Sequence, residues 1–214
     1  MTAKGGFMKV EEAINLAYQT ATGKTKTLSP GNSKYERMLN IANMATMQWE
    51  GEPDVVWGSL CEDREIGVID DNTSYKLSED VRTVDFRKFV RLTKDAQNWT
   101  FPFISPQMAK DGCYGVIQLG WRLDFRGISE QMKGAAIIVP IVRHAKKLTK
   151  ADDIIEVDDP YWLVYMIAAE FVRNSRTKSN QYGNLITLAQ SSMEGMKNRN
   201  GYKFDEVPRE DIWL

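Results

Sequence analysis

Three residues are the first candidates for nucleophilic or metal chemistry: His144, Cys61 and Cys113, the only histidine and the only cysteines of the chain. A serine or cysteine nucleophile needs a base that a third group holds in place, and no motif around His144 indicates such a set. Zinc takes three or four Cys and His ligands at suitable spacing, and the two cysteines form no CxxC pattern. We therefore expect His144 to be a structural or surface residue and expect no zinc site within one chain.

Five acidic residues form the second candidate site. Carboxylates are ligands for Ca²⁺ and Mg²⁺, so a metal site is conceivable here, but the spacing is not that of an EF-hand loop. Two of the five directly precede Pro160, where carboxylates cap a helix and interact favourably with its dipole. We expect capping, and no metal or cofactor. The five are Asp152, Asp153, Glu156, Asp158 and Asp159.

Phosphate recognition has little support in the sequence. Neither GxxxxGK[ST] nor GxGxxG occurs. The basic groups Arg87-Lys88 and 144–147 could contact phosphates, but solvated strand ends explain them equally well. The 28 Lys and Arg residues against 29 Asp and Glu give a net charge of −1, so a global basic surface is excluded. We expect a non-catalytic protein whose main ligand is not nucleic acid.

Composition sets the remaining limits. The 214 residues suit one domain or one domain with an insertion, and 43% hydrophobic residues can build a sizeable core. No apolar run approaches the ~18 residues of a membrane span, and the N-terminal residues lack the apolar stretch of a signal peptide. With two cysteines and no disulfide framework, we expect folding in a reducing cytoplasm.

Four helices are predicted from apolar residues at helical spacing. Ser33 and Glu36 have the spacing of a capping box, and Asp159-Pro160 combines an N-cap with proline at the first helical position. The run 161–172 is apolar on nearly every side, so its helix should be central and buried. The predicted helices cover residues 10–21, 33–50, 160–176 and 179–199.

Between the second and third helix the hydrophobic period changes to about two, which indicates β-strands. Residues 66–69 and 73–77 flank Asp70-Asp71-Asn72 and predict a hairpin. The alternation in 117–125 predicts one strand with Trp121 on its buried face. Residues 86–92 and 135–142 are further strands, with Pro140 indicating an edge or a bulge, and 93–112 is predicted to be a long loop.

We therefore predict an α+β fold. Four main helices form an antiparallel bundle, a mainly antiparallel β module is inserted between the second and third helices, and an extended C-terminal tail follows. The predicted domains are a first helical half (1–57), the β module (58–150), a second helical half that packs on the first (151–201), and the tail (202–214).

Three segments carry a family resemblance. Residues 75–82, with sequence YKLSEDVR, form a strand and a corner; CYGV at 113–116 leads into 119–125; and DDIIEVDDPYWLV at 152–164 precedes a helix with Ala168-Ala169-Glu170. In order and spacing these segments, with a final helix ending in GMKNRN, are similar to the head–tail adaptors of tailed bacteriophages, including the tail tubular A proteins of short-tailed phages. The resemblance covers most of the chain.

The resemblance implies a structural virion protein without catalytic residues or cofactors, made in the host cytoplasm and located at the head–tail junction. It implies a ring of identical subunits, typically twelve, that joins the portal protein to the tail nozzle or tail tube protein. DNA would pass through the ring without specific binding, and no membrane is involved.

The tail carries the predicted binding site. Large apolar residues favour burial and are uncommon in disordered ends, and in adaptors of this family the C-terminus commonly reaches into the portal. We therefore expect portal docking, although folding back onto the helices would also bury these residues. The predicted docking residues are Phe204, Val207, Ile212, Trp213 and Leu214.

Two alternatives remain for the function. One is another virion component, such as a tail-completion protein. The other is a DNA-associated regulator that uses the helical part, which would show salt-dependent DNA binding as a small oligomer. An enzyme with an unrecognised carboxylate site ranks behind both.

Overall fold

The computed structural model describes residues 8–53 and 55–203 of the chain. They divide into two compact units. The helical unit contains the described residues up to 59 and from 145 to 203, and the β unit is Leu60–His144. The β unit is thus inserted into the helical unit. No helix in these described ranges is both long and apolar enough to cross a membrane.

The helical unit contains α1 (Val10–Thr22), α2 (Ser33–Glu50), α4 (Pro160–Val172) and α5 (Ser179–Asn200). All four predicted helices are confirmed, with boundaries that differ by a few residues. The N-cap of α2 is Asn32, whose side chain accepts a hydrogen bond from the Lys34 amide, rather than Ser33. The N-cap of α4 is Asp159, which accepts from the Tyr161 amide, with Pro160 at the first position as predicted.

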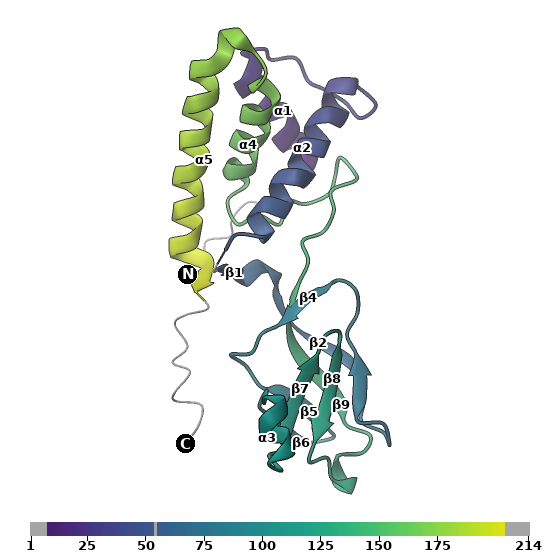
Figure 1. Ribbon diagram of the computed structural model, residues 1–214. Helices are drawn as coiled ribbons and strands as arrows, with labels where there is room; N and C mark the ends of the chain where they lie inside the picture. The colour runs from purple at the N-terminus through teal and green to yellow at the C-terminus, as the bar shows by residue number, and fades with distance from the viewer. Residues whose placement is uncertain (1–7, 54, 204–214) are drawn as a thin grey trace. The chain divides into compact units, whose positions relative to one another are not determined.

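α4 is the central helix. It packs against α1, α2 and α5, and it stands between α5 and α2 in Figure 1. Its side chains are buried on several faces, among them Trp162, Val164 and Ala168. The apolar character of α4 thus requires three other helices around it, and the predicted central position is confirmed.

The chain that follows the β unit supports the start of α1. The amide of Val10 donates to the Asp153 carbonyl and the amide of Glu11 donates to the Ala151 carbonyl, both at 3.0 Å. The first amides of a helix have no hydrogen-bond acceptor within the helix. These two bonds therefore supply acceptors for the first amides of α1. The side chain of Asn43 on α2 holds the same segment through the Leu148 amide and carbonyl, each at 2.9 Å.

A buried asparagine fixes the connection between α1 and α2. Asn15, 8% exposed, accepts from the Leu28 amide at 2.6 Å and donates to the Leu28 carbonyl at 3.2 Å. Its Nδ2 also donates to the Glu11 carbonyl at 3.0 Å. Both backbone polar groups of the buried Leu28 thus find a partner.

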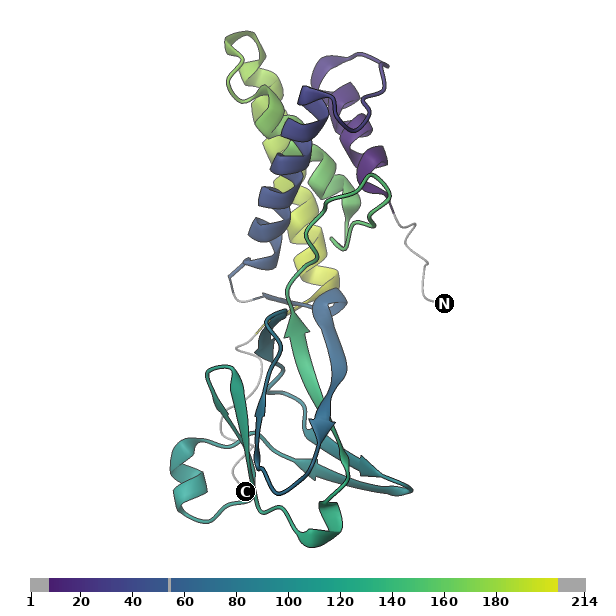
Figure 2. The ribbon, with the colours of Figure 1, turned by 90° about the vertical axis from the view of Figure 1, so that its right-hand side faces the viewer.

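The β unit contains two antiparallel sheets. In the larger sheet, β2 and β9 lie side by side (Figures 1 and 2), β9 also pairs with β5 and β4, and β5 pairs with β6. The smaller sheet has the order β3-β8-β7. The apolar side chains of both sheets form one buried cluster that includes Leu92, Phe125 and Val139. The strands are β2 (Cys61–Val68), β3 (Ser74–Lys76), β4 (Val81–Val84), β5 (Val90–Lys94), β6 (Gln97–Phe101), β7 (Gly115–Leu119), β8 (Arg122–Arg126) and β9 (Ala136–Arg143).

Pro140 lies in the central strand β9, and the register shifts of this sheet fall between Glu65 and Gly67 and between Val81 and Thr83, so the predicted edge position or bulge at Pro140 is wrong. On one side of β9, residues up to Ile138 pair with β5 and residues from Ile141 pair with β4. The Pro140 carbonyl accepts from the Asp85 amide on that side, and in a strand the amide and carbonyl of one residue face the same neighbour. Proline has no amide hydrogen to donate, and in β9 it stands at the position where the neighbouring strand changes from β5 to β4.

The predicted fold, a four-helix bundle with a single inserted β module, is contradicted. The described residues contain five α-helices, because α3 (Pro106–Lys110) lies within the β unit, and the strands of that unit form two sheets instead of one module. A further pair, β1 (Val55–Trp57) with β10 (Gly201–Lys203), belongs to the helical unit. The helices pack around α4 because α4 is apolar on several faces, whereas a bundle with one shared interior needs one apolar face per helix.

Three predictions of local structure in the β unit are also wrong. Residues 117–125 form parts of β7 and β8, because Gly120 has φ +61° and opens a two-residue turn in which Trp121 is 51% exposed. β2 and β3 do not pair with each other but with β9 and β8. The predicted loop 93–112 contains β6 and α3.

We predict that Asn15→Ala lowers the free energy of unfolding by about 1–3 kcal/mol, because the buried amide and carbonyl of Leu28 lose their partner. Urea unfolding followed by circular dichroism measures the change. Gln19→Ala, at an exposed position one turn along α1, is the control and should change stability by less than about 0.5 kcal/mol. Equal stability of the two variants would contradict this role of Asn15.

Candidate functional site

A half-open groove of about 690 Å³ lies on the helical unit between α2, α4 and α5. Trp162 and Met166, one turn apart on α4, line it between the two outer helices. We call it the α2–α5 groove. Its other lining residues are Met47, Gln48, Gly51 and Glu52 from α2 and the residues after it, and Ile186, Ala189, Gln190, Met193, Glu194 and Lys197 from α5.

The charged groups of the groove gather at one end. The Lys197 ammonium forms an ion pair with the Glu52 carboxylate and lies 3.7 Å from a Glu194 oxygen. The hydrogen bond with Glu52 raises the pKa of Lys197, so the lysine stays charged. The rest of the lining consists of apolar side chains, a glycine and two glutamines. Such a surface can hold a neutral, apolar segment of a partner.

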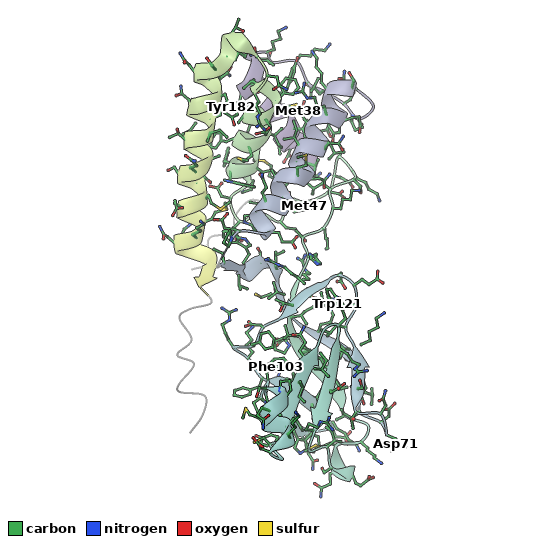
Figure 3. The ribbon with its side chains drawn as sticks, in the orientation of Figure 1. Met38, Met47, Asp71, Phe103, Trp121 and Tyr182 are labelled. Carbon is green, nitrogen blue, oxygen red and sulfur yellow. The ribbon has the colours of Figure 1, made fainter. Side chains whose placement is uncertain are left out.

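The two outer helices of the groove have long stretches without charge. α2 has no charged residue between Arg37 and Glu50, and α5 has none between Lys178 and Glu194. Both stretches nevertheless carry exposed apolar side chains: Met44 is 66% exposed, Met47 71% and Leu188 47%. Figure 3 labels Met47 on α2 together with Met38, which is buried on the same helix.

Exposed helix faces of a soluble protein normally carry charged residues. Depletion of charge and enrichment of methionine and large apolar groups distinguish the centre of a protein–protein interface from the rest of a surface. Methionine also adapts its shape to different partners. The α2–α5 groove and its flanking helix faces therefore have the character of a protein-binding surface.

A second exposed apolar surface lies on the β unit, at the turn between β4 and β5. Phe86 is 52% exposed and Phe89 57%. Phe86 packs edge-on against Phe103, labelled in Figure 3, with ring centroids 5.0 Å apart. The predicted strand 86–92 is correct only from Val90 onward, because residues 86–89 form this turn.

Asp85 holds the turn in place. Its carboxylate, 3% exposed, accepts two hydrogen bonds from the Arg87 guanidinium, at 2.7 and 2.8 Å, and its carbonyl accepts from the Lys88 amide at 3.1 Å. Arg87 and Lys88, considered above as phosphate contacts, are thus bonded within the turn. The aromatic residues on either side are presented by a rigid support.

The pKa of Asp85 follows from this geometry. Burial raises it, but the hydrogen bonds and charge of Arg87 outweigh burial, so the pKa lies below its ordinary value. A carboxyl whose pKa is depressed on folding stabilises the protein above its ordinary pKa, and this stabilisation disappears as the pH falls through the folded value. The turn is therefore weakened by acid.

The residues predicted to dock on the portal lie outside the described residues: Phe204, Val207, Ile212, Trp213 and Leu214. Their docking remains a prediction. Of the tail predicted at 202–214, residues 202 and 203 belong to β10, which pairs with β1.

Of the candidate residues for nucleophilic or metal chemistry, Cys61 begins β2, Cys113 follows α3 and His144 follows β9. His144 is exposed, and its amide donates to the Asp80 carbonyl. Cys113 is exposed and Cys61 partly buried, and neither forms a disulfide. Burial raises the pKa of Cys61, which favours the unreactive thiol form.

The acidic cluster performs local structural tasks. Asp153 accepts from the Thr149 and Lys150 amides at 2.7 Å, and Asp159 accepts from the Ser192 hydroxyl as well as capping α4. Glu156 accepts from the Lys146 amide, and burial raises the pKa of Asp158. In the described part of the chain, no group of three or more His, Cys, Asp or Glu side chains could hold a metal ion.

Neither the α2–α5 groove nor the Phe86–Phe89 turn was predicted from the sequence. The uncharged runs of α2 and α5 are visible in the sequence and were a usable signal for the groove. Met193, at the end of the uncharged run of α5, is partly buried and lines the groove. The turn could have been recognised from Asp85 two residues before Arg87, an aspartate position typical of turns.

No model of a known protein family matches the sequence, and a search of curated proteins found no match either.

We predict that Asp85→Ala lowers the free energy of unfolding by about 2–4 kcal/mol, because it removes one partner of a mostly buried ion pair. Asp63→Ala is the matched control: Asp63 pairs with Arg91 at 2.6 Å, but both side chains are more than 40% exposed. Such an exposed pair contributes less than about 1 kcal/mol. Guanidinium unfolding of both variants measures the difference, and equal losses would contradict the supporting role of Asp85.

Proposed function

We propose that this protein is a structural head–tail adaptor of a tailed bacteriophage, which forms a ring between the portal and the tail and continues the DNA channel. The observation that carries the proposal is that each of the two units has its own exposed apolar surface. An adaptor must bind its neighbours, the portal and the tail protein, and so needs several separate binding surfaces on one chain.

The order and spacing of segments described above also support this function. A ring of identical subunits needs a head-to-tail contact, in which one face of a subunit meets a different face of the next. The α2–α5 groove and the exposed face of α5 are two such faces. The Phe86–Phe89 turn supplies a further surface on a rigid support, and the balanced charge suits a channel through which DNA slides without binding tightly.

We propose that residues 204–214 dock on the portal. Removing these residues leaves all of β10 in the chain, so a truncated protein that folds with unchanged stability would argue against folding back onto the helices. If Trp213 is an anchor in a portal pocket, its loss weakens binding by about 2–4 kcal/mol. Its neighbours Ile212 and Leu214 would enlarge the same contact.

We predict that the full chain binds a purified portal ring with many copies per ring, and that Trp213→Ala weakens this binding by about 30-fold or more. Arg209→Ala, within the same segment, is the control and should bind nearly normally. Mass measurement of the assembled complex gives the copy number. One or two copies per portal would contradict a ring, and sub-micromolar binding of duplex DNA at physiological salt without portal binding would favour the regulator.

A further inference from the structure

We infer that the α2–α5 groove binds the outer face of α5 from a second copy of this chain. The inference rests on the proposed function for its head-to-tail geometry and names the partner of the groove. The structure provides three observations: an uncovered part of the central helix, a matching uncharged helix face, and a fit in length and charge.

The groove exposes part of a helix that three other helices largely cover. α1, α2 and α5 cover most of α4, but Met166 remains only partly buried at the groove, beside Met47 and Met193. The flexible side chains of these methionines can close around an inserted helix. Many proteins bind a helix of their partner in an apolar groove between their own helices.

The outer face of α5 is the uncharged partner surface. Asn184, Thr187, Leu188 and Ser191 are all exposed and none carries charge. The outer face of α5 therefore offers a neutral, exposed surface to a partner.

The two surfaces match in length and charge. The uncharged part of α5, from Ser179 to Met193, extends about 21 Å, and the groove extends about 17 Å along α5 from Ile186 to Lys197, at the helical rise of 1.5 Å per residue. Both surfaces are neutral except at the Glu52–Lys197 end of the groove. Binding would therefore bury no unpaired charge. Burial of an unpaired charge is costly in an interface.

The contact is head-to-tail because the groove and the outer face of α5 are different surfaces. When one copy inserts its α5 into the groove of a second, its own groove and the outer α5 face of the second copy remain open. A third copy can then bind in the same way, and the chain of contacts closes when its rotation divides a circle.

Two single variants test the inference on the full-length protein. Met47→Lys places a charge in the groove, and Leu188→Glu places one on the outer face of α5. Both residues are exposed, so folding should be retained, and circular dichroism with urea unfolding verifies this. Gln19→Glu, on the exposed side of α1, is the control. Self-association is measured by sedimentation equilibrium up to the solubility limit.

We predict that each of the two variants weakens self-association at least about tenfold, while the control associates like the wild type. An equimolar mixture of the two should form heterodimers with wild-type strength, because the intact α5 face of Met47→Lys meets the intact groove of Leu188→Glu. These heterodimers should not grow further, since their remaining surfaces are the altered ones.

A wild-type protein that stays monomeric would overturn the inference, as would a mixture that associates no better than the separate variants. Weakening by Met47→Lys alone would indicate a two-fold contact between grooves and would also overturn it. The experiment contains no portal, so its failure is distinct from failure of the proposed function: portal binding without this self-association would leave the adaptor role standing and remove only the groove contact.

Discussion

The burial of α4 is the constraint on which the helical unit depends. Its side chains are apolar on several faces, and water must be excluded from Trp162, Val164 and Ala168 at once. Three helices cover these side chains: α1 and α2 precede the β unit in the sequence, and α5 follows it. α1 and α2 must therefore meet α4 and α5 before any of them is stable. Because three helices do not enclose α4 completely, the same constraint leaves the α2–α5 groove.

The insertion of the β unit follows from this arrangement. The chain leaves the helical unit after residue 59 and returns at residue 145, and the returning segment bonds to the start of α1 and to Asn43 of α2. Two separate cores result, each with its own exposed apolar surface. The β unit supports its surface through a buried Asp85–Arg87 ion pair, whereas the helical unit exposes its surface by leaving one side of α4 open.

The helices were predictable because each has apolar residues at helical spacing, and at α4 the cap Asp159 and the first residue Pro160 agree with that spacing. The sheets were not, since pairing between distant strands, such as β3 with β8, leaves no local trace in the sequence. The alternation through 117–125 was real, but a two-residue turn at Gly120 folds it back and exposes Trp121. The predicted docking residues lie outside the described residues, and the groove depends on three helices that only the fold brings together.

The most direct measurement is nuclear magnetic resonance of methionine methyl groups as the protein concentration rises. We predict that the methyl signals of Met47, Met166 and Met193 shift together, because all three line the groove that a second copy enters. The signal of Met132, which packs against the core of the β unit, should stay unchanged. Groove signals that are constant at every concentration, or that shift no more than the signal of Met132, would contradict this prediction.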